Sequence, residues 1–434
     1  MNDHVFYRNL RKNYPVADRA DGIYIWDLNG KQYIDGSGGA CVVNIGHAVE
    51  EIRRAMMAQA SQVPFVHSSQ FANQGAIDCA DMLCQLSPDP QLNKVYFLSG
   101  GSEAIESALK MVRQYWCESG RQDKYKVISR WSSFHGNTTG ALALGGHTAR
   151  RQPYLPLFPY TPHIETAYCY RCGLGRNPET CGLECADQLE RSILHEGPDS
   201  VAAFIAEPVI GATAGAVVPR DGYWQRIQDI CDHYEVLLIA DEVMTGVGRC
   251  GKNFGMDNWN VVPDLIVLAK GLSSGYTPLG AVIVKAEVFD TIKNGTGAFM
   301  HGHTFCQNPL STAIGAAVLR YIDEHRLIQR SARMGAHLYD RLKALEAFDI
   351  VGDIRALGLF AGIEFVRNKQ TKAWFEPHLK VNQMIANTAF ERGLITYPGG
   401  GGIDGVHGDH LLLAPPFIIT ESQIDDMVTI LEET

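Results

Sequence analysis

Two short apolar runs in the sequence, residues 236–243 and 264–270, bring a charged side chain to the end of a predicted strand. The first run contains Asp241 and the second ends in Lys270. Short runs rich in Val, Leu and Ile are typical of strands buried on both faces of a parallel sheet. Ligands of such sheets bind at the carboxyl ends of the strands, so both side chains are expected to face one crevice. A lysine that can form a Schiff base, with an aspartate that keeps a pyridine nitrogen protonated, is the minimum equipment for pyridoxal phosphate chemistry.

Each of these two residues also has a simpler interpretation. Lys270 alone fits a solvated lysine at the end of a strand, and Asp241 alone fits the cap of a helix or turn. Their spacing, combined with the motifs described below, favours the chemical interpretation.

A predicted strand at residues 95–99 runs directly into Gly100, Gly101 and Ser102, where a helical pattern begins. Glycines at a helix start leave backbone N–H groups free, and the helix dipole favours an anion there. Ser102 adds a hydroxyl, and the sequence therefore predicts a phosphate site. The alternative is that Ser102 and Glu103 only cap the helix.

Two further predicted strands end in polar or aromatic residues. The strand at 126–130 leads to a glycine-containing turn with Phe134 and His135, and the strand at 201–206 is followed by Glu207. An aromatic ring in such a turn can stack on a flat heteroaromatic ring, although a phenylalanine taken alone is usually a core residue.

The formal charge of −10 argues against a nucleic-acid partner, because binding to phosphate backbones depends on clustered Lys and Arg. No apolar run reaches the length of a membrane span, and residues 1–12 lack the apolar centre of a signal peptide. We expect a soluble protein of the cytoplasm with small-molecule substrates and no membrane association.

Four of the eleven cysteines, Cys169, Cys172, Cys181 and Cys185, form two closely spaced pairs. Such pairs are typical of structural zinc sites with four thiolate ligands. Free thiols, which are usual in a reducing compartment, and a redox-sensitive disulfide are the alternatives. Free thiols are favoured because nothing else in the sequence indicates a zinc fold and the predicted catalysis needs no metal.

Taken together, these motifs resemble the class III aminotransferases, the ornithine and ω-amino-acid group of fold-type-I pyridoxal phosphate enzymes. The resemblance covers nearly the whole chain and is most specific around the two charged strand ends. The matching segments are residues 239–243, 263–272, 100–104, 134–136, 206–208, 303–305 and 308–309.

The resemblance implies an α/β fold with a mainly parallel sheet of the seven-stranded type in a large cofactor-binding domain. Strands that alternate with helical patterns independently indicate such a sheet. We assign residues 61–325 to this domain and 326–434 to a smaller α+β domain. Residues 1–60, which contain a predicted hairpin turning at Asn29 and Gly30, are expected to pack with the small domain.

The resemblance also implies roles for the cofactor-contacting residues. Lys270 would bind pyridoxal phosphate covalently and later move the proton of the substrate carbon, while Asp241 would pair with the pyridine nitrogen. Phe134 would stack on one ring face, and Val243 would pack against the other.

The remaining implied roles concern the phosphate and the surrounding pocket. Gly101 and Ser102 would bind the phosphate, and Thr304 would reach the phosphate of a neighbouring subunit. That contact implies a homodimer with shared active sites. His135 and Glu207 would be supporting pocket residues.

One segment departs from the family pattern. Relatives often carry an arginine for the acceptor carboxylate in the loop that here spans residues 399–410, and this loop contains none. His407 occupies the approximate position, but a histidine carries only part of a charge at neutral pH and cannot form the two-pronged contact of an arginine. We therefore hypothesise weaker or altered recognition of the acceptor carboxylate through His407.

The predicted function is a transaminase for ω-amino acids or amines that works by a ping-pong mechanism, with pyruvate favoured over 2-oxoglutarate as acceptor. The first alternative is a pyridoxal phosphate-dependent amino-acid racemase or epimerase on the same fold, which the missing arginine favours. The second is a non-catalytic binding protein, against which the intact pair of Lys270 and Asp241 counts.

Overall fold

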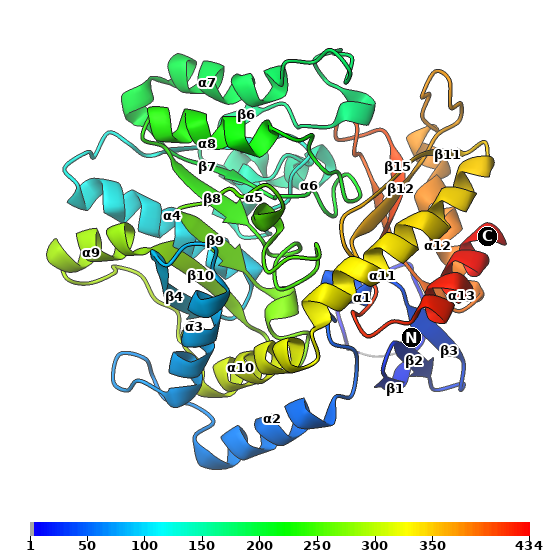
Figure 1. The fold of residues 1–434 in the computed structure, drawn as a ribbon, viewed down its shortest axis with the longest axis horizontal. Helices are drawn as coiled ribbons and strands as arrows, with labels where there is room; N and C mark the ends of the chain where they lie inside the picture. The colour runs from blue at the N-terminus through cyan, green and yellow to red at the C-terminus, as the bar shows by residue number, and fades with distance from the viewer. Residues whose placement is uncertain (1–3) are drawn as a thin grey trace.

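A seven-stranded sheet forms the centre of the computed structural model, which describes residues 4–434 (Figure 1). The strand order is β4-β10-β9-β8-β7-β5-β6, and only β10 runs antiparallel to its neighbours. The predicted mainly parallel sheet is therefore confirmed. The strands are β4 (Leu92–Leu98), β5 (Lys126–Arg130), β6 (His163–Ile164), β7 (Val201–Ala206), β8 (Leu237–Asp241), β9 (Leu265–Leu268) and β10 (Gly280–Lys285).

Helices cover both faces of this sheet, and for this reason its central strands β7, β8 and β9 are apolar except for Asp241 at the end of β8. All residues of β7 are buried. Ala203 and Ile205 pack in a cluster with side chains of α4 (Gly101–Glu118), whereas Phe204 packs with α7 (Glu184–Glu196) and α8 (Tyr223–His233). Because successive side chains of a strand point to opposite faces, α4 lies on one side of the sheet and α7 and α8 on the other (Figure 1).

The start of the chain joins the C-terminal part through a shared sheet. Its order is β1 (Ala17–Asp21), β2 (Tyr24–Asp27), β3 (Gln32–Asp35) and β13 (Leu394–Ile395), with β3 and β13 parallel. The Lys31 ammonium donates to the carbonyl oxygens of Phe390 at 3.2 Å and Glu391 at 2.8 Å. The hairpin is thus tied to residues more than 350 positions away in the chain.

A second four-stranded sheet, antiparallel throughout, lies in the C-terminal part. Its order is β11 (Val351–Ala356), β12 (Ala361–Phe365), β15 (Asp409–Leu413) and β14 (Tyr397–Gly400). The helices α11 (Leu327–Leu342), α12 (Val381–Glu391) and α13 (Glu421–Glu432) pack around it (Figure 1). Thr420 caps α13, because its side chain accepts a hydrogen bond from the Gln423 N–H.

The remaining helices lie mainly around the large sheet and its connections. They are α1 (Gly38–Cys41), α2 (Glu50–Gln62), α3 (Gln74–Leu86), α5 (Thr139–Leu144), α6 (Thr148–Arg151), α9 (Ala286–Asn294) and α10 (Pro309–Glu324). None of the helices between residues 4 and 434 is both long enough and apolar enough to cross a membrane.

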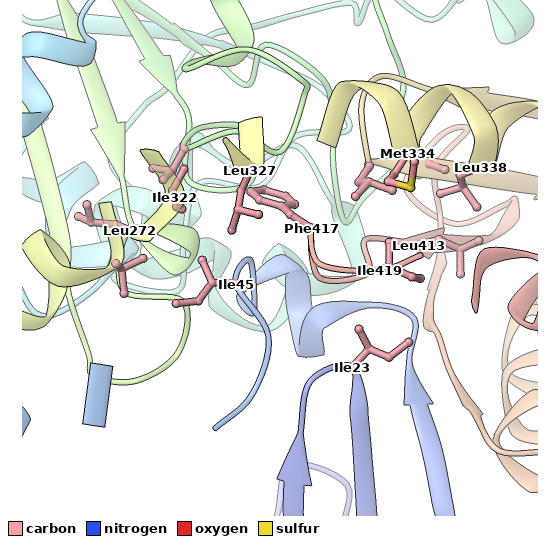
Figure 2. Packing of buried hydrophobic residues seen from close by; sticks show 14 of the residues in the cluster. Ile23, Ile45, Leu272, Ile322, Leu327, Met334, Leu338, Leu413, Phe417 and Ile419 are labelled. Carbon is pink, nitrogen blue, oxygen red and sulfur yellow. The ribbon is translucent and has the colours of Figure 1, made fainter. Parts of the chain in front are cut away.

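One hydrophobic core continues from the large sheet into the C-terminal part. It includes Leu272, which follows β9, and reaches Leu413 of β15 through Leu327 and Phe417. Figure 2 shows these side chains in one band, with Ile45 of the N-terminal segment facing it. Because all of them are almost completely buried, the loops that surround the large sheet are held on a rigid base.

Candidate active site

A pocket of about 160 Å³ opens at the carboxyl ends of β7, β8 and β9, next to the first turn of α4. It brings together eight of the nine residues that the sequence analysis assigned to cofactor binding. The residues that line it are Gly101, Ser102, Phe134, His135, Gly136, Glu207, Asp241, Val243, Met244, Ala269 and Lys270.

Asp241, the last residue of β8, is held rigidly in this pocket. One carboxylate oxygen, Oδ2, lies 2.7 Å from Nδ1 of His135, and the other, Oδ1, accepts a hydrogen bond from the Val243 N–H at 3.1 Å. Asp241 is only 3% exposed. The Nε2 atom of His135 has no hydrogen-bond partner among residues 4–434. The pair therefore presents a fixed acidic group to any ligand in the pocket.

Lys270 follows β9 at the other side of the pocket and begins a short 3₁₀ helix, Lys270–Leu272. Its φ of +45° lies in the left-handed region, which costs a non-glycine residue about 1–2 kcal/mol. Burial lowers the pKa of the Lys270 ammonium, an effect that Cys41, Asp241 and Glu207 oppose and Arg150 reinforces. A lowered pKa leaves more of the amine neutral, which is its nucleophilic form.

Glu207 supports the turn that carries the aromatic ring. Its Oε2 accepts a hydrogen bond from the Phe134 N–H at 3.3 Å, and its Oε1 accepts one from the Gly211 N–H at 3.2 Å. Burial raises the pKa of Glu207, and the nearby Asp241 charge adds to this, while His135 and Arg130 act in the opposite direction. Glu207 is thus a positioning group for the turn.

The first turn of α4 forms the small-residue end of the pocket. Gly136 has a φ of +141°, and a Cβ atom there would lie 2.5 Å from Oγ of Ser102. Oε2 of Glu103 accepts a hydrogen bond from the Ser99 N–H at 3.0 Å. The Ser102 side chain does not cap the helix; its hydroxyl accepts a hydrogen bond from the Asn137 N–H at 3.1 Å. Free N–H groups, a hydroxyl and missing side chains together make a cradle suited to a phosphate.

Comparison with known proteins identifies the family. A family model described as Aminotransferase class-III matches residues 6–434. The chain belongs to the class III aminotransferases. Enzymes of this family use pyridoxal phosphate, and the predicted cofactor, transaminase activity and fold-type-I architecture are therefore confirmed.

Three relatives illustrate the similarity within the class III aminotransferases. The chain is 40% identical over 435 residues to the uncharacterized aminotransferase YodT of Bacillus subtilis, covering 100% of this chain and 98% of YodT. It is 36% identical to the putrescine–pyruvate aminotransferase of Pseudomonas aeruginosa, and the match covers 98% of this chain and 91% of that enzyme. An amine transaminase structure from an uncultivated Pseudomonas species, with pyridoxal phosphate bound, has a TM-score of 0.91 and 34% identity and covers 100% of this chain and 97% of that chain. All three are aminotransferases, so the racemase and non-catalytic alternatives find no support among them.

The residues of the pocket fit the family's cofactor. A lysine amine and a buried carboxylate face the same space, and an aromatic ring and a branched aliphatic side chain are available to cover a flat ring. The glycine-lined turn beside α4 is suited to the phosphate, since a single added Cβ at Gly136 would fill it.

Thr304, the ninth residue assigned to the cofactor, does not line the pocket of its own chain. It is exposed, in a loop whose next residue, Phe305, is 58% exposed and packs edge-on against Phe65 with ring centroids 5.7 Å apart. Within one chain, this aminotransferase therefore leaves Thr304 facing outward.

The structure does not bring His407 to the pocket. Its Nδ1 pairs with Oδ2 of Asp404 at 2.6 Å, and its ring lies 4.7 Å from that of Trp374. The loop folds back on itself, because the Gly405 N–H donates to the Gly401 carbonyl oxygen. The hypothesis that His407 replaces the missing arginine is consequently not supported by this geometry.

A larger pocket of about 520 Å³ lies beside the cofactor pocket and was not recognised from the sequence. Its walls come from α6, the start of α12, β14 and the adjoining loops, and it contains His147 and Arg150. His147 is buried, its Nε2 lies 2.8 Å from the Gly400 carbonyl oxygen, and burial lowers its pKa. No spacing or motif in the sequence marks these two residues, because they meet the other wall only in the folded chain.

The four clustered cysteines line a small pocket of about 20 Å³, and all eleven cysteines are free thiols in the structure. Cys181 donates from its Sγ to Oε2 of Glu184 at 3.2 Å. Between residues 4 and 434, no group of three or more His, Cys, Asp or Glu side chains could hold a metal ion. The zinc interpretation of Cys169, Cys172, Cys181 and Cys185 is thus without structural support.

Proposed function

We propose that this class III aminotransferase moves the amino group of an ω-amino acid or amine to a keto acid, preferably pyruvate, by a ping-pong mechanism centred on Lys270. One observation carries the proposal. Asp241 ends β8, Lys270 follows the adjacent parallel strand β9, and both line the same pocket, beside a cradle suited to a phosphate.

Pyridoxal phosphate, when bound, supplies an electrophilic carbonyl and a ring that withdraws electrons from the substrate carbon. Lys270, whose pKa is lowered by burial, would bind the cofactor and then, as a neutral amine, take the proton from that carbon. Asp241, held in place by His135 and the Val243 N–H, would keep the ring nitrogen protonated.

The other pocket residues would orient the cofactor and exclude water. Phe134 and Val243 would cover the two ring faces, and Gly101 and Ser102 would hold the phosphate through N–H groups and a hydroxyl. Exclusion of water strengthens the charge interactions on which the reaction depends.

We further propose that two chains form a dimer in which each contributes Thr304 to the other's phosphate site. Two observations support this: Thr304 is exposed and outside its own pocket, and apolar side chains are exposed in the same region. Phe71 is 62% exposed, Phe305 58% and Met300 79%. Sedimentation should give a dimer, and a monomer with full activity would contradict shared sites.

The choice of pyruvate is supported by the similarity to the putrescine–pyruvate aminotransferase. A half-reaction panel tests it: the yellow enzyme is mixed with single amines, and bleaching identifies the donors. Pyruvate or 2-oxoglutarate is then added to the bleached enzyme, and pyruvate is expected to restore the colour faster. Conversion of a chiral amine to its mirror image without any keto acid would instead favour the racemase alternative.

A further inference from the structure

We propose that Arg150 binds the carboxylate of the keto acid or amino acid in this enzyme. It would replace the carboxylate-binding arginine that the loop of residues 399–410 lacks. The inference rests on the proposed transaminase function. It replaces the sequence-based assignment of this role to His407.

Arg150 stands at the junction of the two pockets. Its guanidinium lies 4.6 Å from the centroid of the Phe134 ring, which lines the cofactor pocket. The same residue lines the pocket of about 520 Å³ next to it. A substrate whose reacting carbon is close to Lys270 can therefore place a carboxylate at Arg150 while the rest of the molecule extends into the larger pocket.

The guanidinium of Arg150 makes no hydrogen bond or ion pair with residues 4–434. Two other guanidiniums of this part of the molecule, both with little exposed surface, are held by protein acceptors. Arg249 donates to the carbonyl oxygens of Leu359 and Pro415 at 2.9 and 2.7 Å, and Arg355 pairs with Asp353 at 2.6 Å. Arg150 is half-buried, so its N–H donors are protected from bulk water without being saturated by the protein.

Stacking on Phe134 also suits the geometry of carboxylate recognition. A guanidinium that lies over a ring is held in one plane, and its edge remains free for two parallel N–H bonds to a carboxylate. The positive charge is close enough to lower the pKa of Lys270, which places it within electrostatic range of the reacting groups. It would also offset the repulsion that Glu207 and Asp241 exert on an anionic substrate.

Lys380 is the other cation of the larger pocket, and it provides a matched control. It is exposed, and its compact ammonium lacks the two-pronged geometry. The proposal predicts that Arg150 and not Lys380 discriminates between substrates with and without a carboxylate.

The test compares Arg150→Gln, Arg150→Lys and Lys380→Met holoenzymes in separate half-reactions. Arg150→Gln should raise the pyruvate concentration for half-maximal rate by about 10- to 100-fold, the usual range for a charged hydrogen-bonded contact. Its bleaching by putrescine, which has no carboxylate, should stay within about two-fold of wild type. Arg150→Lys should recover part of the loss, and Lys380→Met should leave the discrimination between pyruvate and putrescine as in wild type.

Equal losses with pyruvate and putrescine, or no loss with pyruvate, would overturn the inference. A titration with propionate, followed through the absorbance of the bound cofactor, separates it from the proposed function. Propionate carries a carboxylate and neither an amine nor a keto group. If wild type binds propionate and Arg150→Gln does not, the inference stands even where no transamination is seen, and in that case only the proposed function fails.

Discussion

The cofactor pocket and the larger pocket beside it are built from different parts of the chain. The first is assembled from the ends of three adjacent strands and the start of α4, and its acidic group is fixed by hydrogen bonds from two sides. The second is walled by short elements and loops of distant segments, residues 147–152, 377–383 and 398–409. Strand ends thus form a rigid base for the proposed chemistry, whereas segments from two parts of the molecule form the surface that we propose for substrate recognition. Substitutions in the two pockets should therefore have different kinetic signatures.

The largest effect is expected at Lys270. Lys270→Ala would remove both the proposed attachment point of the cofactor and the group proposed to move the proton, so turnover should fall on the order of 10⁴-fold or more. The visible absorbance of the lysine-bound cofactor should disappear in the same variant. Turnover above one-hundredth of wild type would break the assignment of the chemistry to this pocket.

The next effect in size is expected at Asp241. Asp241→Asn keeps the shape of the side chain but removes the charge proposed to keep the ring nitrogen protonated, and turnover should fall by about 10²- to 10³-fold. Glu242→Gln is the matched control, because the Glu242 carboxylate binds the Gly255 and Met256 N–H groups in the core and does not line the pocket. Glu242→Gln should lower the melting temperature of the protein but retain most of the wild-type turnover. A larger loss of turnover in Glu242→Gln than in Asp241→Asn would contradict the role of Asp241.

An intermediate effect is expected at Gly136. In Gly136→Ala the added methyl group meets Ser102 Oγ at 2.5 Å in a backbone conformation with φ of +141°, and cofactor affinity should fall by about 10-fold. Gly120→Ala shares a positive φ, +74°, but meets nothing within 4 Å, and its cofactor affinity should be unchanged. Titration of the apoenzyme with pyridoxal phosphate measures both. Equal affinities in the two variants would count against the phosphate cradle.

The smallest effect is expected at Gly405, in the wall of the larger pocket. A Cβ atom at this glycine, whose φ is +86°, collides with Oγ1 of Thr148, so Gly405→Ala should shift the wall. The KM for substrates should rise by about 5-fold while cofactor affinity and absorbance stay as in wild type. Loss of cofactor affinity comparable to that of Gly136→Ala would remove the functional distinction between the two pockets.

The elements predicted correctly from the sequence are those whose pattern is local. The strands β8 and β9, which lead to Asp241 and Lys270, are apolar apart from Asp241 itself, and the strands predicted at 126–130 and 201–206 coincide with β5 and β7. By contrast, the sequence analysis did not find β11 or β14. The strand β14 reads Tyr-Pro-Gly-Gly, which has low intrinsic strand propensity, and it is extended because it pairs with β15.

By itself, the sequence determined the large parallel sheet, the family and most of the residues that line the candidate cofactor pocket, because buried strands and strand ends leave a short, regular pattern of residue types. Only the tertiary structure decided which cationic side chain lies next to the candidate cofactor pocket. His407 contacts Asp404 and Trp374, whereas the Arg150 guanidinium packs on the Phe134 ring. The direction of these side chains depends on how loops from distant parts of the chain pack together, and such packing has no period or spacing in the sequence.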